Sequence, residues 1–468
     1  MDRLHARRTS VALVLSLLAV AIAAAAPSPA RPEDRRPNIV LILTDDQSPA
    51  SLPHDPPAMP YLQARMEDPQ DHWIWFPNAF LNTPLCCPSR ASILTGRYSH
   101  HTGVRTNDDG HRLDESATIA TWLHAAGYHT GLVGKYVNGY PFGPGRYVPP
   151  GWDVWLSKKQ GAQTSAYQRY TLIDQGLPAY HGDGPANYST DVYADAAVSF
   201  VRDAPPDRPF FLTIATTAPH RPWTPALRHS TTSADVPIVE APSVGEEDVS
   251  DKPDWVRSLS PLDRDDLAQL HRLHRRSFET LRAVDELVAA VIAALKARDV
   301  LDRTMVLFLS DNGFSFGEHQ WVGKTCAYEE CIRTPFLIRY PGTLGRADER
   351  LVSNVDVAPT IADLAGVRPD PPADGQSLVP VLEGASDVPW RSGVLLEYVG
   401  DEKIPPWWAV RTSNFLYVEL ATGERELYDL GGILGPPDPY QLENLVGDPA
   451  YAGITVRLAA ALIRLRAG

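Results

Sequence analysis

Residues 38–44 of the chain read Asn38-Ile39-Val40-Leu41-Ile42-Leu43-Thr44 and are followed at once by Asp45-Asp46. An unbroken aliphatic and β-branched run of this length is typical of a strand buried on both faces, as in the middle of a parallel sheet. In open α/β sheets, ligands bind beyond the carboxyl ends of such strands. The aspartate pair therefore marks an expected binding site, although such a pair is also a common turn or helix cap.

Two further runs of the same kind end at polar residues. Residues 209–216 lead into His220, and residues 304–310 lead into Asp311-Asn312-Gly313. An Asn-Gly pair would also suit a hairpin turn, but no matching antiparallel strand follows it. A shorter run ends at Lys135, which in isolation reads as a solvated lysine. Because the carboxyl ends of parallel strands meet at one edge of a sheet, we expect these side chains to gather there.

Helical segments alternate with these strands. The longest covers residues 271–298, where apolar side chains recur on one stripe at helical spacing. This alternation predicts an α/β fold with a large, doubly wound, mostly parallel sheet flanked by helices over residues 38–385. Short strands and turns follow, so residues 386–468 are predicted to form a small C-terminal α+β subdomain with an antiparallel sheet. Residues 141–190, rich in Gly, Pro, Tyr and Trp, are expected to be long loops over the large sheet.

The N-terminus has the pattern of a secretory signal peptide. Residues 1–26 combine a basic start with an apolar run too short to span a membrane comfortably, and they end in small residues. Residues 27–37 form a Pro-, Ala- and Arg-rich linker. We therefore expect a protein that is secreted, periplasmic or held at the cell surface, with no transmembrane helix in the mature chain. The choice between Sec and twin-arginine export is left open.

The charge of the chain restricts its partners. The formal net charge is −14, from 43 Lys and Arg against 57 Asp and Glu. A general nucleic-acid binder needs a basic face, so no nucleic-acid partner is expected. An anionic substrate is still compatible with this charge, because a local cluster of cations can outweigh the global field. Four cysteines are too few for a disulfide scaffold in 468 residues, and the sequence leaves open whether Cys326 and Cys331 pair.

The strand ends carry oxygen ligands for a metal ion. Asp45, Asp46 and Asp311 offer three carboxylates, and Asn312 offers an amide oxygen. A hard, all-oxygen cage of this kind suits Ca²⁺ or Mg²⁺ far better than Zn²⁺. The sequence therefore predicts one divalent cation at this edge of the sheet.

Two adjacent cysteines begin the segment Cys86-Cys87-Pro88-Ser89-Arg90, which runs on to Leu94-Thr95-Gly96-Arg97. Pro88 suits the first position of a helix. That would place Cys86 just ahead of a helix N-terminus, where backbone N–H groups and the dipole favour an anion. Arg90 adds a permanent charge with a fork geometry suited to an oxyanion. Disulfide bonding or two buried thiols would explain the cysteine pair by itself equally well.

The whole segment resembles the sulfatase signature C-x-P-S-R-x-x-x-L-T-G-R at every defined position. The resemblance covers nearly the whole chain from Pro37 to about Leu445, including Glu426-Leu427-Tyr428-Asp429-Leu430. In that family the first cysteine, here Cys86, is converted to formylglycine by a formylglycine-generating enzyme, and the hydrated aldehyde is the nucleophile. The resemblance thus implies a sulfuric ester hydrolase, with Cys87 as a bystander.

The resemblance also implies roles for the other site residues. One divalent cation, usually calcium, would be bound by Asp45, Asp46, Asp311, Asn312 and the modified Cys86. The catalytic residues expected beside Cys86 are Arg90, Lys135, His220 and Lys324.

One position departs from the family pattern. Many sulfatases have a histidine where this chain has Val137, so Asn138 or His319 is a candidate to take over part of its role. The group that protonates the leaving oxygen is left open between His220, His319 and Lys324.

Several segments, among them the doubled cysteine and Gly134-Lys135-Tyr136-Val137-Asn138, are similar to the N-acetylglucosamine-6-sulfatase branch. This implies a 6-O-sulfated N-acetylglucosamine or a related, glycosaminoglycan-like sugar as substrate. Alternatives are an arylsulfatase of broad specificity and a phosphodiesterase or phosphonate monoester hydrolase on the same scaffold. A further alternative is an inactive sulfated-sugar-binding protein in which Cys86 stays a thiol.

Overall fold

The computed structural model describes residues 36–143, 145–161, 166–232, 241–385 and 387–467. These residues belong to one compact unit. The predicted signal peptide, residues 1–26, and most of the predicted linker lie outside the described residues. Within the described ranges, no helix has both the length and the apolar character needed to cross a membrane.

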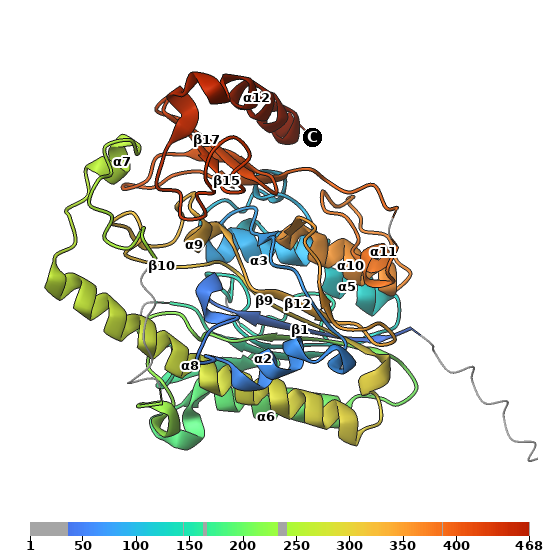
Figure 1. The fold of residues 1–468 in the computed structure, drawn as a ribbon. Helices are drawn as coiled ribbons and strands as arrows, with labels where there is room; N and C mark the ends of the chain where they lie inside the picture. Colours follow the sequence, from blue (N-terminus) through green and yellow to red (C-terminus); the bar gives the residue numbers. More distant parts are fainter. Residues whose placement is uncertain (1–35, 144, 162–165, 233–240, 386, 468) are drawn as a thin grey trace, which may run out of the picture. The chain divides into compact units, whose positions relative to one another are not determined.

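A ten-stranded sheet forms the centre of this unit (Figure 1). Its middle strands are parallel and lie in the order β9 (Thr304–Ser310), β1 (Asn38–Thr44), β8 (Phe210–Ala215), β4 (His129–Gly134), β5 (Val154–Lys158). Beyond β9 lie β12 (Phe336–Arg339), β2 (Trp73–Trp75) and β13 (Arg346–Ala347), and beyond β5 lie β6 (Tyr170–Asp174) and β7 (Leu177–His181). Since antiparallel pairs occur only toward the edges, the predicted mostly parallel sheet is confirmed.

The sheet is buried on both faces, which explains the unbroken apolar run at residues 38–44. Ile39, Leu41 and Leu43 contribute to one core cluster, and Val40 and Ile42 contribute to the other, because successive side chains of a strand point to opposite faces. One face is covered by α2 (Pro60–Glu67), α6 (Ser189–Asp203) and α8 (Arg264–Ala297). The other is covered by α3 (Cys86–Thr95), α5 (Ile119–Ala125) and α10 (Val357–Leu364).

Two sequence-based predictions need correction. The longest helix, α8, begins at Arg264 rather than at residue 271, because Asp263 accepts hydrogen bonds from the N–H groups of Asp265 and Asp266 and so caps the helix. Residues 141–190 are not all loop, since they contain β5, β6 and β7. The turn between β6 and β7 uses Gln175 and Gly176 in left-handed conformations, and no regular alternation of apolar residues marks these strands in the sequence.

A second, antiparallel sheet lies near the C-terminus, as predicted. Its strands are β15 (Val394–Tyr398), β16 (Trp407–Arg411), β17 (Phe415–Leu420) and β18 (Arg425–Asp429). One face packs on α12 (Ala452–Ala467), and side chains of the other share a core with residues of the large sheet's connections, such as Phe80 and Tyr328. This second contact places the small sheet beside the strand-end edge.

The remaining elements are short. Two-stranded pairs are formed by β10 (Ser315–Phe316) with β11 (Val322–Gly323) and by β3 (Ala79–Phe80) with β14 (Val352–Ser353). The remaining α-helices are α4 (Ser99–Thr102), α7 (Asp254–Arg257), α9 (Glu329–Ile332) and α11 (Val379–Leu382).

Candidate active site

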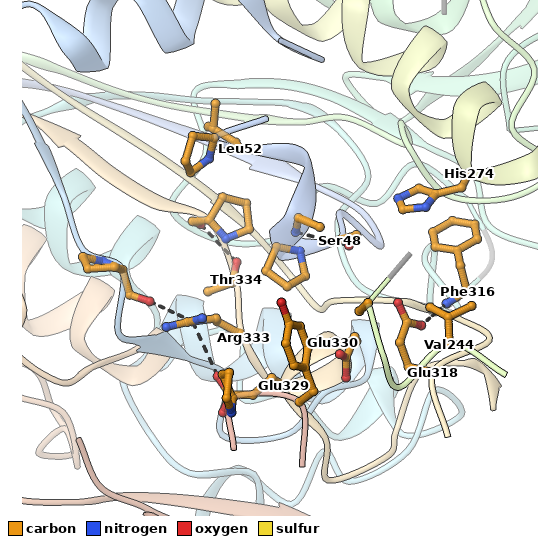
Figure 2. A pocket seen from close by; sticks show the side chains of 18 of the residues that line it. Ser48, Leu52, Val244, His274, Phe316, Glu318, Glu329, Glu330, Arg333 and Thr334 are labelled. Carbon is orange, nitrogen blue, oxygen red and sulfur yellow. Dashed lines mark hydrogen bonds and ion pairs between the residues drawn. The ribbon is translucent and has the colours of Figure 1, made fainter. Parts of the chain in front are cut away.

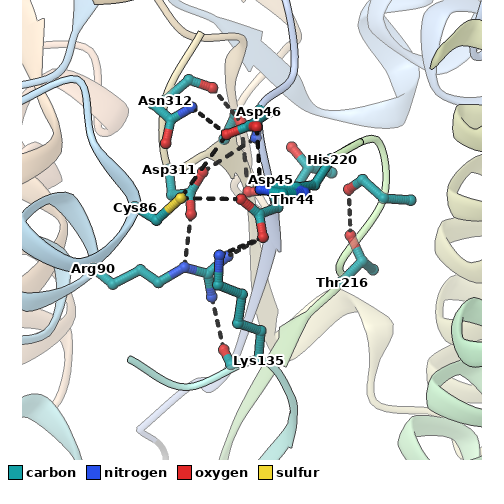
Figure 3. Close-up of polar contacts among 12 residues, drawn as sticks. Thr44, Asp45, Asp46, Cys86, Arg90, Lys135, Thr216, His220, Asp311 and Asn312 are labelled. Atoms are coloured by element: carbon teal, nitrogen blue, oxygen red, sulfur yellow. Dashed lines mark hydrogen bonds and ion pairs between the residues drawn. The ribbon is translucent and has the colours of Figure 1, made fainter. Parts of the chain in front are cut away.

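The predicted strand-end residues converge on one cluster (Figure 3). Thr44 at the end of β1 is in register with Ser310 at the end of β9, so Asp45 and Asp311 follow side by side. The N–H of Asp311 donates to the carbonyl of Thr44 at 3.0 Å. Two buried parallel strands thus bring together carboxylates that are 266 residues apart in sequence.

Cys86 faces this cluster from the first residue of α3. The sequence analysis placed Cys86 just before the helix and Pro88 at its first position. The helix instead begins at Cys86, so the predicted start is wrong by two residues. The first N–H groups of a helix need no helical partner, so a proline at the third position costs no hydrogen bond. The N–H of Cys87 instead donates to Asn107 Oδ1 at 3.1 Å, and Gly96, with a φ of 72°, ends the helix.

Three cations pair with the three carboxylates of the cluster. Lys135 Nζ lies 2.5 Å from Asp45 Oδ2, and Lys324 Nζ lies 2.6 Å from Asp46 Oδ1. One turn into α3, Arg90 donates from Nε to Asp311 Oδ2 at 2.7 Å. Arg90 also donates to the backbone oxygen of Lys135 at 2.7 Å, which fixes the connection after β4. The sequence-predicted cations are therefore in contact with the sequence-predicted carboxylates.

These ion pairs set the protonation of the carboxyl groups. Burial opposes ionisation of Asp45, but Lys135, His220, Arg90 and Lys324 together hold its pKa well below the ordinary value. Burial also opposes ionisation of Asp46, and Lys324 and His220 lower its pKa. At Asp311, burial and the charge of Asp45 outweigh Arg90 and raise the pKa. A cation bound beside Asp311 would therefore stabilise its ionised form.

Two buried oxygen atoms of the cluster have no hydrogen-bond partner among the described residues: Asp46 Oδ2 and Asn312 Oδ1. The amide of Asn312 donates to Asp46 Oδ1 at 2.6 Å, so both side chains are held together. Asp46 has a φ of 64°, which is unusual for a residue other than glycine and is found where function constrains the backbone. Buried oxygens without a hydrogen bond, in a cluster that contains three carboxylates, fit a hard divalent cation.

The side chains whose ligand atoms lie close enough together to hold a metal ion differ slightly from the predicted metal ligands. Asp45, Asp46, Cys86 and His220 present ligand atoms within 4.8 Å of one another. His220 joins this group because its Nε2 lies 3.5 Å from Asp46 Oδ2. His220 was predicted at the site from its place after β8, although as a catalytic residue rather than a ligand.

The thiol of Cys86 is surrounded by polar groups. Its Sγ lies 3.5 Å from Asp45 Oδ1 and 2.8 Å from Lys324 Nζ. Burial nevertheless raises the pKa of Cys86 to about 12, so near neutral pH the unmodified side chain is a thiol and not a thiolate. A cysteine used directly as a nucleophile has its pKa lowered instead.

The two candidate histidines occupy different environments. His220 is partly exposed, with its Nδ1 2.6 Å from the backbone oxygen of Arg221. His319 is fully buried, with its Nδ1 2.6 Å from Glu246 Oε2 and its ring packed on Tyr328. In the parts of the chain that the structure describes, no contact joins His319 to Cys86.

Lys324 is held by the segment that follows it. Cys326 and Cys331 form a disulfide with an S–S distance of 2.07 Å, which answers the question that the sequence left open. Cys86 and Cys87 are both buried and free. The disulfide links the segment just after Lys324 to α9. The indole N–H of Trp407, in the small sheet, donates to the carbonyl of Thr325 at 2.9 Å.

A cavity of about 350 Å³ opens over Cys86, Asp45, Lys135 and His220. We call it the Cys86 cavity. Sequence reasoning missed four residues that also line it: Asn107, Lys158, Gln160 and Arg221. Two of these lie in or just after β5, in the stretch that was expected to be loop. A neighbouring cavity of about 530 Å³ shares Asn107 and Arg221 and is lined by Lys324, Trp321 and Tyr398.

A third cavity, of about 470 Å³, does not contain any predicted site residue (Figure 2). We call it the Glu330 cavity. Its walls are largely proline and apolar, and its polar groups include Glu318, Glu330 and His274. Burial and the charge of Glu318 raise the pKa of Glu330 well above its usual range, and Glu330 Oε2 has no hydrogen-bond partner among the described residues.

The fold and the strand-end cluster agree with the family comparisons. The family model for sulfatases matches residues 37–367, and a model described as N-sulphoglucosamine sulphohydrolase, C-terminal, matches residues 317–468. The chain belongs to the sulfatase family, whose members hydrolyse sulfate esters.

Individual proteins of known name or structure are also similar to this chain. N-acetylglucosamine-6-sulfatase from Homo sapiens is 34% identical over 385 residues, which are 78% of this chain and 68% of that protein. An arylsulfatase from Volvox carteri is 31% identical over 500 residues, covering 92% of this chain and 74% of that protein. A protein solved in complex with its substrate, D-glucosamine-2-N,6-O-disulfate, has a TM-score of 0.79 and 26% identity, covering 92% of this chain and 97% of that chain.

Proposed function

We propose that this sulfatase removes the 6-O-sulfate of N-acetylglucosamine or of a closely related sulfated sugar. The observation that carries the proposal is the position of Cys86, which lies against Asp45 and Lys324 and lines a cavity with Asp45, Lys135 and His220. The names of the human relative and of the substrate in the similar solved structure support a 6-sulfated glucosamine. The Volvox relative supports an arylsulfatase of broad specificity as the alternative.

In the proposed mechanism, residue 86 acts as formylglycine made from Cys86 by a formylglycine-generating enzyme. One hydroxyl of its hydrated aldehyde attacks sulfur as the S–O bond to the sugar breaks. The second hydroxyl then loses its proton, and the C–O bond to the sulfate breaks, so that the aldehyde returns and sulfate leaves. A thiol has no second hydroxyl, so an unmodified Cys86 could not complete this cycle.

The charged residues orient the sulfuryl group. The ammonium groups of Lys135 and Lys324 would face its oxygens, while Arg90 holds Asp311 in place. His220 is our choice for the group that protonates the leaving oxygen, because it lines the Cys86 cavity and is partly exposed. His319 has neither property in the described residues, so Lys324 remains the second candidate.

We propose Ca²⁺ as the bound cation, with Mg²⁺ as the alternative. Asp45, Asp46, Asp311 and Asn312 would hold it together with residue 86, and the unpaired oxygens of Asp46 and Asn312 support this assignment. When bound, such an ion neutralises charge on the transferring group.

The test compares substrates on one protein preparation. Sulfate release from N-acetylglucosamine-6-sulfate and from 4-nitrophenyl sulfate is measured beside hydrolysis of bis-4-nitrophenyl phosphate. We expect both sulfates to be cleaved, with the sugar preferred at kcat/KM. A strong preference for the phosphate diester would assign the site to the phosphodiesterase or phosphonate hydrolase alternative instead.

We also propose that residues 1–26 direct export and are then removed, which places the enzyme outside the cytoplasm. N-terminal sequencing of protein recovered from the medium or periplasm tests this. A mature N-terminus after the small residues near Ala26 is expected, and retention of residues 1–26 in a cytoplasmic protein would contradict it.

A further inference from the structure

Lys158 is a buried cation of the Cys86 cavity that the mechanism above does not use. It ends β5, and its strand is in register with β4 so that Ser157 pairs with Gly134. Lys158 therefore follows the same sheet edge as Lys135. Its side chain is only 5% exposed and lines the cavity together with Asp45, Cys86 and Lys135.

Lys158 differs from the other cations of the site because it has no ion pair with a carboxylate among the described residues. Lys135, Arg90 and Lys324 each lie within 2.7 Å of a carboxylate oxygen. In residues 36–467, apart from the stretches left undescribed, no carboxylate contacts the Lys158 ammonium. Burial and the charge of Lys135 lower the pKa of Lys158 to about 8. Arg221, on the rim between the two neighbouring cavities, adds a second cation without an ion pair in the described chain.

Lys158 and Arg221 give the cavity more positive charge than one sulfate ester requires. The three carboxylates of the cluster are already paired with Lys135, Arg90 and Lys324 before the proposed divalent cation is added, and the transferring sulfuryl group brings a single negative charge to Lys135 and Lys324. A buried ammonium without a counter-ion is costly and is stabilised by any anion that reaches it. Lys158 therefore favours a substrate with a further negative charge.

Two amide side chains extend this wall of the cavity. Asn138 Oδ1 and Gln160 Nε2 are both buried, both belong to residues that line the Cys86 cavity, and neither has a hydrogen-bond partner among the described residues. One is an acceptor and the other a donor, so together they suit the hydroxyl groups of a sugar. The cavity that contains Cys86 thus also presents one cation and two amide atoms without a hydrogen-bond partner among the described residues.

We propose that Lys158, flanked by Asn138 and Gln160, forms a subsite for a second anionic substituent of the substrate sugar. This inference rests on the proposed function. The second anion is a sulfate or a carboxylate, since both present oxygen atoms to an ammonium group. The enzyme would then prefer sugars with two negative groups over the singly sulfated sugar.

The experiment measures kcat and KM for three substrates with the full-length enzyme. They are N-acetylglucosamine-6-sulfate, glucosamine-2-N,6-O-disulfate, and N-acetylglucosamine-6-sulfate linked to glucuronic acid. Lys158→Met removes the charge, Lys158→Arg retains it, and Lys159→Met is the matched control because Lys159 is the exposed neighbour.

We expect the wild type to prefer one doubly charged substrate, and the preferred one identifies the second anion. Lys158→Met should raise KM for that substrate roughly 10- to 100-fold, the scale of one lost charge-assisted hydrogen bond. KM for the singly sulfated sugar should rise less than KM for that substrate, so that the preference falls. Lys158→Arg should recover most of the preference, and Lys159→Met should behave as wild type.

Three results would overturn the proposal. The first is equal use of all three substrates by the wild type. The second is an equal fall of kcat on all substrates in Lys158→Met, which would make Lys158 the leaving-group acid. The third is the same loss in Lys159→Met.

A binding measurement separates this inference from the proposed function. Calorimetric titration of each doubly charged sugar into Cys86→Ala, with and without Lys158→Met, needs no turnover. Weaker binding of either sugar with Lys158→Met supports the subsite even if the wild type hydrolyses none of the sugars, and unchanged binding of both refutes the subsite even if the wild type is an active sulfatase.

Discussion

The Cys86 cavity and the Glu330 cavity each contain a buried carboxyl group, but the pKa values of the two groups are shifted in opposite directions. At the Cys86 cavity, Lys135 and its neighbouring cations hold the pKa of Asp45 below its usual value despite burial. At the Glu330 cavity, burial and Glu318 raise the pKa of Glu330. The Glu330 cavity is the larger of the two, at about 470 Å³ against about 350 Å³. Compensation of charge, and not volume, distinguishes the candidate active site.

The difference follows from where the residues lie. Asp45, Lys135 and Asp311 follow the ends of parallel strands, so the sheet forces cations and carboxylates together. Glu330 lies in the short helix α9, where burial and the charges of Glu318 and Glu329 raise its pKa against the opposing charge of Arg333. The following predictions test this contrast, from the largest expected effect to the smallest.

The largest effect is expected for the two adjacent cysteines. Cys86→Ser should lower kcat by about 10⁴-fold or more, or accumulate sulfated enzyme, because loss of a nucleophile removes most of the rate enhancement. Cys87→Ala should keep most of the activity, since Cys87 packs in the core and not at the cavity. Steady-state assays with 4-nitrophenyl sulfate measure both, and full turnover by Cys86→Ser would refute the mechanism.

A carboxylate-to-amide change should separate the two cavities. Asp311→Asn should lower kcat/KM by about 100-fold or more, since it removes a carboxylate of the proposed cation site and the partner of buried Arg90. Glu330→Gln should leave kcat/KM within about twofold, because its carboxyl group lies outside the reacting cluster. Comparable losses in the two variants, each assayed at saturating Ca²⁺, would remove the distinction between the cavities.

The disulfide Cys326–Cys331 joins the segment that follows Lys324 to α9, next to Glu330. Replacing both cysteines by serine should lower kcat about 10-fold, because Lys324 must keep its position near Cys86. It should also lower the free energy of unfolding by about 2 kcal/mol. Chemical denaturation and sulfate-release assays measure these effects. Unchanged activity would show that Lys324 is positioned without the disulfide.

The smallest effect is the pH dependence of stability at Glu330. The folded-state pKa of Glu330 lies well above the ordinary value of 4.5, so the folded protein holds a proton that the unfolded chain releases. Stability from this group is full below about 4.5 and is lost as the pH rises toward the folded-state pKa. Glu330→Gln should therefore raise the melting temperature by about 1–2 °C at pH 8, with a smaller gain at pH 5. A lower melting temperature at pH 8 would contradict this assignment.

Sequence reasoning identified the features that local pattern determines. The run at residues 38–44 and the gathering of the residues that follow β1, β4, β8 and β9 were predicted from the sequence, because buried parallel strands have a distinct composition and their ends meet at one edge. The start of helix α3, which carries Cys86, was predicted to within two residues. The packing of His319 against Glu246 could not be predicted, since residues 73 positions apart meet only through the folded loops.

Other features depend on tertiary structure in the same way. Lys158 was missed because β5 lacks a regular apolar alternation and lies in a Gly- and Pro-rich stretch. The opposite pKa shifts of Asp45 and Glu330 depend on which charges surround each group, and the sequence does not give that arrangement. Pairing of Cys326 with Cys331 likewise needed the distance between them.

The most direct test of the central claim is the chemical state of residue 86. Mass spectrometry of the peptide containing residues 86–90, from protein produced with a formylglycine-generating enzyme, should show a species about 18 Da lighter than the cysteine form, the difference between CH₂SH and CHO. The abundance of this species should rise in proportion to sulfatase activity across preparations. Full activity in protein whose residue 86 is entirely cysteine would contradict the account.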